Sequence, residues 1–293
     1  LLRSGAIGDV LSVHFEWLLD TRHGADYFRR WHRDKRNSGG LMVHKASHHF
    51  DLVNWWLDTT PQTVFGFGGL KFYGYDNAEA RGETPRPYRS HGSPTRATDP
   101  WAIDLEGDPT LRGLYLDAEA EDGYLRDRDV FSDGISIEDD MAVLVRYTSG
   151  ASMTYHLTAY SPWEGYRVMF NGTRGRLELD CEERSYVSGR RDDPHGPGVD
   201  PSTGPPLQST RLTLRPLWEA PREIPIVEGE GGHGGGDRRL LDDLFGPPAA
   251  TSDPLGRAAG HLDGAYAMLV GAAANRSFAT EMPVRIADLV DIP

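Results

Sequence analysis

Two histidines and an aspartate stand about one helical turn apart in the segment SGGLMVHKASHHFDLVNWWL, residues 38–57. At about 100° per residue, His44, His48 and Asp51 fall on one side of a predicted helix, together with Trp55. A helix that only meets solvent normally carries Lys, Glu or Gln on its outer face. Imidazoles and a carboxylate can instead hold or transfer a proton near neutral pH, which favours a chemical role for this face.

Regular elements must position these side chains. Ala46, Phe50, Val53 and Leu57 lie within a narrow arc and predict the face of the helix that packs on a core. Runs of strands, with helices segregated at the two ends, predict an α+β fold with an open, mostly antiparallel sheet and helices on one face. The predicted strands are Val10–Leu19, Thr63–Tyr73, Met141–Tyr147, Ala151–Tyr160, Tyr166–Phe170, Arg176–Leu179, Arg211–Leu217 and a short one around Val284, and the further helices are Asp237–Phe245 and Asp253–Ala274.

Composition narrows the class of protein. The net charge of -13 argues against nucleic acid as a partner, because phosphate binding needs a basic face. No apolar run approaches the roughly 20 residues that cross a bilayer, so we expect no membrane contact. Cys181 is the only cysteine, which excludes an internal disulfide and a cysteine-built zinc site and favours a reducing, cytoplasmic setting. Because the chain opens with Leu1 and its first methionine is Met42, we expect it to be the later part of a longer protein.

The candidate helix also carries a family resemblance. Gly40, His44, Ala46, His48 and Asp51 resemble the signature G-G-x-x-x-D-x-G-x-H-x-x-D of the glucose-fructose oxidoreductase, inositol dehydrogenase and rhizopine-catabolism (Gfo/Idh/MocA) family. His48 falls on the catalytic histidine of that family and Asp51 on its trailing aspartate, while His44 replaces an aspartate and Ala46 a glycine. The segments GAIGDVLSV, EDDMAVLVRYTSGA, SPWEGYRVMFNGTRGRLE and PVRIADLV are similar to the later domain of the same family.

The resemblance implies an activity and a domain organisation. Residues 1–293 would be the C-terminal substrate-binding and oligomerisation domain, with a long insertion or lid at about 74–134 and no dinucleotide-binding domain, since no strand, G-x-G-x-x-G and helix follow one another. The whole protein would be an NAD- or NADP-dependent oxidoreductase that transfers a hydride from a carbinol of a sugar, polyol or sugar derivative to nicotinamide. Its own N-terminal Rossmann domain would hold the cofactor, and copies would form a homo-oligomer through the sheet. The fragment alone would be inactive.

Within this scheme His48 is the residue expected to handle the hydroxyl proton. Because His44 is a second titratable group in place of the family's aspartate, which of the two is the base stays open. Further candidates for substrate binding are Lys45, Tyr160, Trp163, Glu164 and His233, and candidates for the cofactor pyrophosphate are Arg33, Lys35 and Arg36. Each has a plainer alternative, namely a solvated or internally paired charge, a packed turn, or a helix cap beside His233.

Other functions remain open on the sequence alone. The histidine pair could be structural, or His44, His48 and Asp51 could hold a divalent metal in a hydrolase, although no remote ligand is evident and we assign no metal. The family resemblance also allows an NAD-dependent glycosidase that oxidises its substrate only transiently. A non-catalytic domain that oligomerises or binds carbohydrate is the third possibility.

Overall fold

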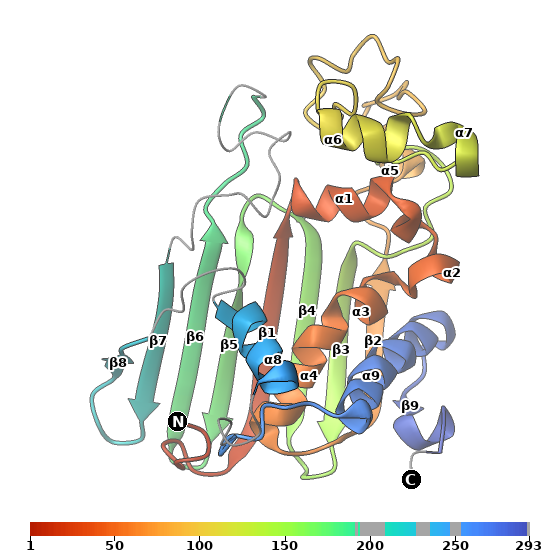
Figure 1. Ribbon diagram of the computed structural model, residues 1–293. Coiled ribbons are helices and arrows are strands. Elements are labelled where there is room, and N and C mark those ends of the chain that lie inside the picture. The colour runs from red at the N-terminus through yellow and green to blue at the C-terminus, as the bar shows by residue number, and fades with distance from the viewer. Residues whose placement is uncertain (191–192, 194–208, 227–234, 247–252, 292–293) are drawn as a thin grey trace.

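A large sheet forms the centre of the molecule (Figure 1). The computed structural model describes residues 1–190, 193, 209–226, 235–246 and 253–291. In these residues nine strands pair in the order β8-β7-β6-β5-β1-β4-β3-β2-β9, and only β1 and β4 run parallel. The strands are β1 (Val10–Asp20), β2 (Pro61–Gly69), β3 (Asp140–Tyr147), β4 (Ser152–Ser161), β5 (Glu164–Gly172), β6 (Gly175–Arg184), β7 (Ser209–Pro216), β8 (Arg222–Ile224) and β9 (Val284–Arg285). The predicted α+β fold with an open, mostly antiparallel sheet is confirmed.

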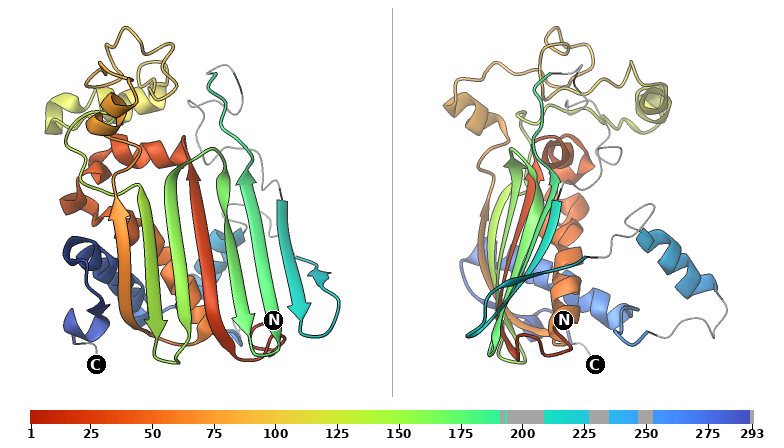
Figure 2. Two further views of the ribbon diagram at one scale, coloured as in Figure 1. Left: turned by 180° about the vertical axis from the view of Figure 1, so that it is seen from behind. Right: turned by 90° about the vertical axis from the view of Figure 1, so that its left-hand side faces the viewer.

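Helices cover one face of this sheet and leave the other open (Figure 2). They are α1 (His23–Arg29), η1 (Trp31–Arg33), α2 (Lys35–Ser38), α3 (Gly40–His44), α4 (Ala46–Leu57), α9 (His261–Thr280) and the closing turn η5 (Ile286–Asp288). The helix α8 (Gly236–Phe245) has no buried residue and stands away from the sheet. The sequence predicts a helix over residues 38–57 with a glycine hinge, and the structure breaks it a second time, at Lys45. The left-handed backbone of Gly39 (φ 71°) ends α2, and Lys45 separates α3 from α4. No helix in the described part of the chain is long and apolar enough to span a membrane.

Side-chain alternation along the strands builds the core. On β1, Val13 and Phe15 are buried toward the helices, whereas His14 is exposed on the open face. The open face carries charges that alternate across neighbouring strands, since Glu16 stands opposite Arg167, which in turn stands opposite Asp180 on β6. Opposite charges in cross-strand pairs stabilise a solvated sheet surface.

Two glycines let helices approach their supports closely. A Cβ on Gly24 of α1 would lie 1.8 Å from the carbonyl oxygen of Ala159 on β4. A Cβ on Gly271 of α9 would lie 2.4 Å from the carbonyl oxygen of Met42 on α3. These contacts leave no room for any side chain, so the sheet and α9 fix the positions of α1 and α3.

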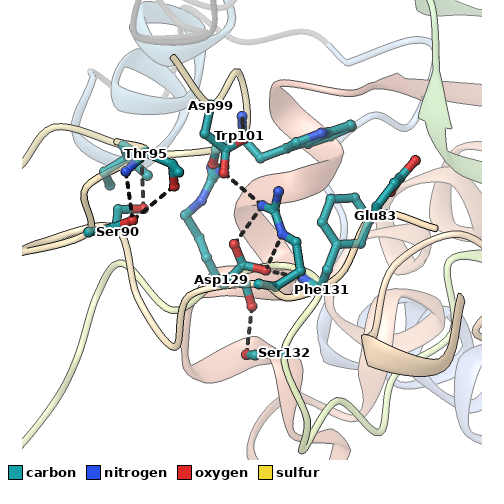
Figure 3. Close-up of polar contacts among 12 residues, drawn as sticks. Glu83, Ser90, Thr95, Asp99, Trp101, Asp129, Phe131 and Ser132 are labelled. Atoms are coloured by element: carbon teal, nitrogen blue, oxygen red, sulfur yellow. Dashed lines mark hydrogen bonds and ion pairs between the residues drawn. The ribbon is translucent and has the colours of Figure 1, made fainter. Parts of the chain in front are cut away.

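The segment 74–134, predicted as an insertion or lid, folds beyond the end of the strands next to α1 (Figures 1 and 2). It contains the short helices α5 (Tyr75–Ala80), α6 (Pro109–Leu111), η2 (Arg112–Leu116) and α7 (Glu119–Asp122). Arg86 Nη2 bonds to Asp99 and to Asp129, 2.7 Å from an oxygen of each. The close-up in Figure 3 shows Asp99 next to Trp101 and Asp129 next to Phe131. Arg29 of α1 donates to the Trp101 carbonyl at 2.6 Å. Arg126 of the segment also pairs with Asp26 of α1 at 2.7 Å, so the segment braces α1 through an ion pair and a hydrogen bond.

Candidate active site

The outer face of α3 and α4 carries the two histidines of the signature. His44 ends α3 and His48 lies in the first turn of α4, and both residues are exposed. On the inner side Ala46, Phe50 and Val53 are fully buried, as the periodicity predicts. The imidazoles are therefore available to a ligand rather than part of the packed interior.

Asp51 has a different environment from the imidazoles. It is half-buried and lines a cavity of about 580 Å³ beside Trp55 and Asp263. Burial raises the pKa of Asp51, the nearby Asp263 carboxyl raises it further, and His48 opposes the shift. His48 thus lies within electrostatic range of Asp51.

Aromatic rings and a second imidazole surround His44. Its ring centre lies 4.0 Å from that of His32, 5.6 Å from Tyr27 and 6.4 Å from Trp31, all carried by α1 and η1. His32 is 2% exposed, and its Nδ1 has no hydrogen-bond partner among the described residues. Burial, with the charges of His44 and Arg30, lowers the pKa of His32 from 6.5 to about 4. Burial and Arg30 also lower the pKa of His44, so both rings favour the neutral form that can accept a proton.

A carboxylate, an imidazole and a phenol line up beside this cluster. Glu164 Oε1 lies 2.6 Å from His23 Nδ1, and His23 Nε2 lies 3.3 Å from the Tyr27 hydroxyl. Arg184 Nη1 lies 3.2 Å from the other oxygen of Glu164. Burial raises the pKa of Glu164, but the hydrogen bond from His23 and the charges of His23 and Arg184 outweigh it and hold the pKa below its ordinary value. An ionised Glu164 orients His23, as a carboxylate does for the imidazole of a catalytic dyad.

The floor of the site is an aromatic stack. His49 is 3% exposed, and its Nδ1 lies 2.7 Å from the Tyr155 hydroxyl. Its ring stacks at 4.1 Å on Trp17, which stacks at 5.0 Å on Tyr166. Lys45 Nζ lies 5.6 Å from the centre of the Trp17 ring. Of the two adjacent histidines in the signature, His48 faces outward and His49 supports the site from within.

Tyr160 and Trp163, two of the predicted sugar-binding residues, contact other parts of the chain and not the histidines. The Tyr160 hydroxyl donates to Asp140 at 2.6 Å, and the ring stacks on Phe72 at 4.9 Å. Trp163 packs against Arg167, with 5.2 Å between guanidinium and ring, and lines a surface cavity with open-face residues of β5 and β6. Glu164 is therefore the one member of the proposed Tyr160, Trp163 and Glu164 rim that the structure brings to the histidines.

The basic residues proposed for the cofactor have partners within the chain. Arg33 is buried and donates to backbone carbonyls of residues 129–133 at 2.8 to 3.3 Å. Lys35 pairs with Glu138, and Arg36 pairs with a neighbouring aspartate while its side chain stays 88% exposed. The geometry favours internal pairing for Arg33 and Lys35, whereas Arg36 retains access to solvent.

Two further possibilities raised by the sequence concern His233 and a metal site. His233 lies outside the described residues. Among the residues that the structure covers, no group of three or more His, Cys, Asp or Glu side chains is arranged to hold a metal ion.

Comparison with known proteins gives the family. A model described as the oxidoreductase family, C-terminal alpha/beta domain, of the Gfo/Idh/MocA type, matches residues 1–286. The chain belongs to this family. Oxidoreductase YteT of Bacillus subtilis (strain 168) is 36% identical to this Gfo/Idh/MocA chain over 305 residues, and the match covers 99% of the chain and 65% of YteT.

Solved structures share the fold of this Gfo/Idh/MocA domain. An oxidoreductase domain protein from Kribbella flavida is 18% identical with a TM-score of 0.58, covering 98% of the chain and 62% of its own. Levoglucosan dehydrogenase in complex with NADH is 17% identical with a TM-score of 0.54, covering 97% and 60%. The chain thus spans less than two thirds of the length of each of these proteins.

Several residues that line the site of this Gfo/Idh/MocA domain were not predicted from the sequence. They come from β1, α1, η1 and β6 and are Trp17, His23, Tyr27, His32 and Glu183. One signal was present, because His23, Tyr27 and Trp31 recur every four residues on a helical face, as His44 and His48 do. For Trp17 and Glu183 no local pattern marks the position.

Proposed function

We propose that this chain is the substrate-binding and catalytic-histidine domain of an NAD(P)-dependent oxidoreductase that acts on a carbinol of a sugar, polyol or sugar derivative. The observation that carries the proposal is the pair His44 and His48, both exposed on the outer face of α3 and α4 and within electrostatic range of one another, in a member of an oxidoreductase family. The relative whose structure contains NADH is a levoglucosan dehydrogenase, which is consistent with a nicotinamide cofactor and a sugar-like substrate.

His48 is proposed as the group that takes the hydroxyl proton. It is exposed, and neutral imidazole accepts a proton near pH 7. His44 is proposed to hold the same hydroxyl by a hydrogen bond, and its lowered pKa keeps it in the neutral form. The packing of His32, Tyr27 and Trp31 around His44 limits the positions that its ring can take. Such fixed orientation is a principal source of catalytic rate.

The cofactor supplies the hydride acceptor when it is bound. The described residues fit the substrate end of this reaction rather than the phosphates of a dinucleotide. The glycine-rich run that starts at Gly66 lies in β2 and beyond its end, and a Cβ on Gly66 would lie 2.9 Å from the ring of Phe278 on α9. These glycines serve close packing, whereas a phosphate loop needs free backbone N–H groups ahead of a helix. We therefore assign cofactor binding mainly to an N-terminal Rossmann domain of the whole protein, with Arg36 as the one of the three basic candidates Arg33, Lys35 and Arg36 that remains well exposed.

The decisive experiment uses the full-length protein with NAD or NADP and a panel of sugars and polyols. His48→Ala is expected to lower kcat by roughly 10²- to 10⁴-fold, because a general base is lost, while the Kd for the cofactor stays unchanged. The matched control is His261→Ala, an exposed histidine at the start of α9. Unchanged turnover of the His48 variant would remove this residue from the mechanism. Product analysis with catalytic amounts of cofactor separates net oxidation from transient oxidation by a glycosidase.

We also propose that two copies of the protein pack through the open face of the sheet. Phe67 is 61% exposed and Leu144 52% exposed on adjacent strands of that face, so a contiguous apolar area meets solvent in the single chain. A second copy of the same face would cover this area and match the alternating charges beside it.

A further inference from the structure

Two opposite charges face the site from places where the secondary structure is irregular. Lys45 stands at the interruption between α3 and α4. Glu183 is the extra residue of a β-bulge, because Glu164 pairs with Arg184 and Gly165 pairs with Glu182, which leaves Glu183 without a partner on β5. Bulges redirect a side chain relative to its strand and are frequent beside active sites.

These two charges influence one another without pairing. Each contributes to the electrostatic shift of the other's pKa. Yet neither side chain forms a hydrogen bond or an ion pair within 4.0 Å with any residue that the structure describes. Both residues are only partly exposed. A Lys and a Glu that lose water usually come together, since an unpaired buried charge is costly.

Burial sets the direction in which the pKa of Lys45 and the pKa of Glu183 shift. It lowers the pKa of Lys45 against the attraction of Glu164 and Glu183. It raises the pKa of Glu183, and the neighbouring Glu164 adds to the effect. In the free protein the charged form of each group is therefore less stable than in water.

The surrounding polar groups are already engaged. Glu164 is held by His23 and Arg184, and His49 bonds to Tyr155. The Trp17 indole N–H, buried beneath Lys45, has no partner among the described residues. Unsatisfied groups of this kind concentrate where a ligand completes the site. The side-chain groups that remain available for hydrogen bonds to a ligand are the three donor hydrogens of the Lys45 ammonium and the acceptor oxygens of Glu183.

We propose that Lys45 and Glu183 form a substrate subsite that binds two neighbouring neutral hydroxyl groups, the first accepting a hydrogen bond from the Lys45 ammonium and the second donating to the Glu183 carboxylate. Adjacent hydroxyls on a sugar or polyol provide this acceptor and donor together. An anionic group would meet the carboxylates of Glu183 and Glu164, and a cationic group would meet Lys45. The proposal rests on the proposed function only in taking this ligand to be the substrate of the same site.

The first test is the effect of neutral substitutions on stability. In the full-length protein without ligand, Lys45→Met and Glu183→Gln should each raise the midpoint of thermal unfolding, by roughly 2 °C or more, because each removes a charge that folding desolvates. Arg184→Met is the matched control, a buried charge with partners, and should lower the midpoint. A lower midpoint for both Lys45→Met and Glu183→Gln would mean that the pair is structural and would overturn the subsite.

The second test uses D-glucose and D-glucuronate, which differ in charge at one carbon. The reporter is the NMR signal of the Trp17 indole N–H, with the 98% exposed Trp218 as an internal reference for unspecific effects. D-glucose should shift the Trp17 signal with an apparent affinity at least tenfold higher than D-glucuronate, and both Lys45→Met and Glu183→Gln should lose this response. An equal or stronger response to D-glucuronate, or no response to either sugar, would overturn the proposal.

The two proposals fail separately in these experiments. The NMR titration contains no cofactor and reports binding alone. A Trp17 response to D-glucose, together with no turnover of any sugar or polyol in the separate assay with NAD or NADP, contradicts the dehydrogenase function and leaves the subsite intact. Turnover that is unaffected by Lys45→Met and Glu183→Gln, in kcat and in KM, contradicts the subsite and leaves the function intact.

Discussion

Gly271 offers a sharp test of how the helices position the histidines. It lies where α9 crosses α3, and a Cβ there would stand 2.4 Å from the Met42 carbonyl oxygen and 3.1 Å from Val43 Cα. Both contacts are backbone atoms, which cannot rotate away. Gly271→Ala therefore forces the two helices apart by about 1 Å, and α3 ends in His44 two residues after Met42.

The expected magnitude follows from two opposing effects. Alanine gains about 1 kcal/mol of helix propensity over glycine. Overpacking of a tight contact costs about 1 to 3 kcal/mol, so Gly271→Ala should destabilise the fold by up to about 2 kcal/mol. Gly264 lies in the first turn of the same helix with nothing within 4 Å of its Cβ position. Gly264→Ala should therefore stabilise the fold by roughly 0.5 to 1 kcal/mol.

The assay is equilibrium urea unfolding of both variants and the parent protein, followed by circular dichroism. The imidazole NMR signals of His44 provide a local readout, which should move in the Gly271 variant and stay unchanged in the Gly264 variant. Equal stabilisation by the two substitutions would refute the close crossing of α3 and α9. An unchanged His44 signal in a destabilised Gly271 variant would refute the claim that this crossing positions the site.

Two further predictions concern His32 and the open face. The pKa of His32 is about 4 in the folded protein, against an ordinary value of 6.5 that we take for the unfolded chain. As the pH falls from 6.5 to 4, the unfolded chain therefore binds a proton at His32 that the folded protein does not bind. The free energy of unfolding falls by up to about 3 kcal/mol over this range. Urea unfolding at pH 7 and at pH 4.5 should show a smaller loss for His32→Gln than for the parent protein, and an equal loss would contradict the assignment. Phe67→Arg should reduce the mass measured by light scattering to that of a smaller species, whereas Trp218→Arg should not; an unchanged mass for the Phe67 variant would contradict packing through the sheet.

Strands were the part of the fold that the sequence predicted well. Residues Met141–Tyr147 and Ala151–Tyr160 alternate between apolar and polar side chains, and they form β3 and β4 with boundaries shifted by a residue at most. The alternation works because one face of the sheet packs under helices while the other meets solvent. The structure of the segment 74–134 was harder to predict, because ion pairs between distant residues hold it together. Arg86 and Asp129, for example, are 43 positions apart.

The candidate site was predicted only in part because its contacts cross the sheet. The signature identified the exposed histidines on α3 and α4. The pairing of His23 with Glu164 joins residues 141 positions apart and depends on β1 lying between β4 and β5. A single sequence reports the period of each element but not which elements become neighbours, so the partners of the helix could not be derived from it.

Irregular backbone explains the remaining difference between the predicted site and the site in the structure. Periodicity describes a continuous helix or strand, and beyond the glycine hinge it therefore placed His44, His48 and Asp51 on one continuous helix. The structure breaks that helix at Lys45, whose ammonium lies over the Trp17 ring, and inserts a bulge at Glu183, whose carboxylate lies within electrostatic range of Lys45. Regular elements supply the rigid frame, while departures from regularity determine where individual charges point. Sequence periodicity therefore predicts the helices and strands that support such a site more readily than the individual residues that give it specificity.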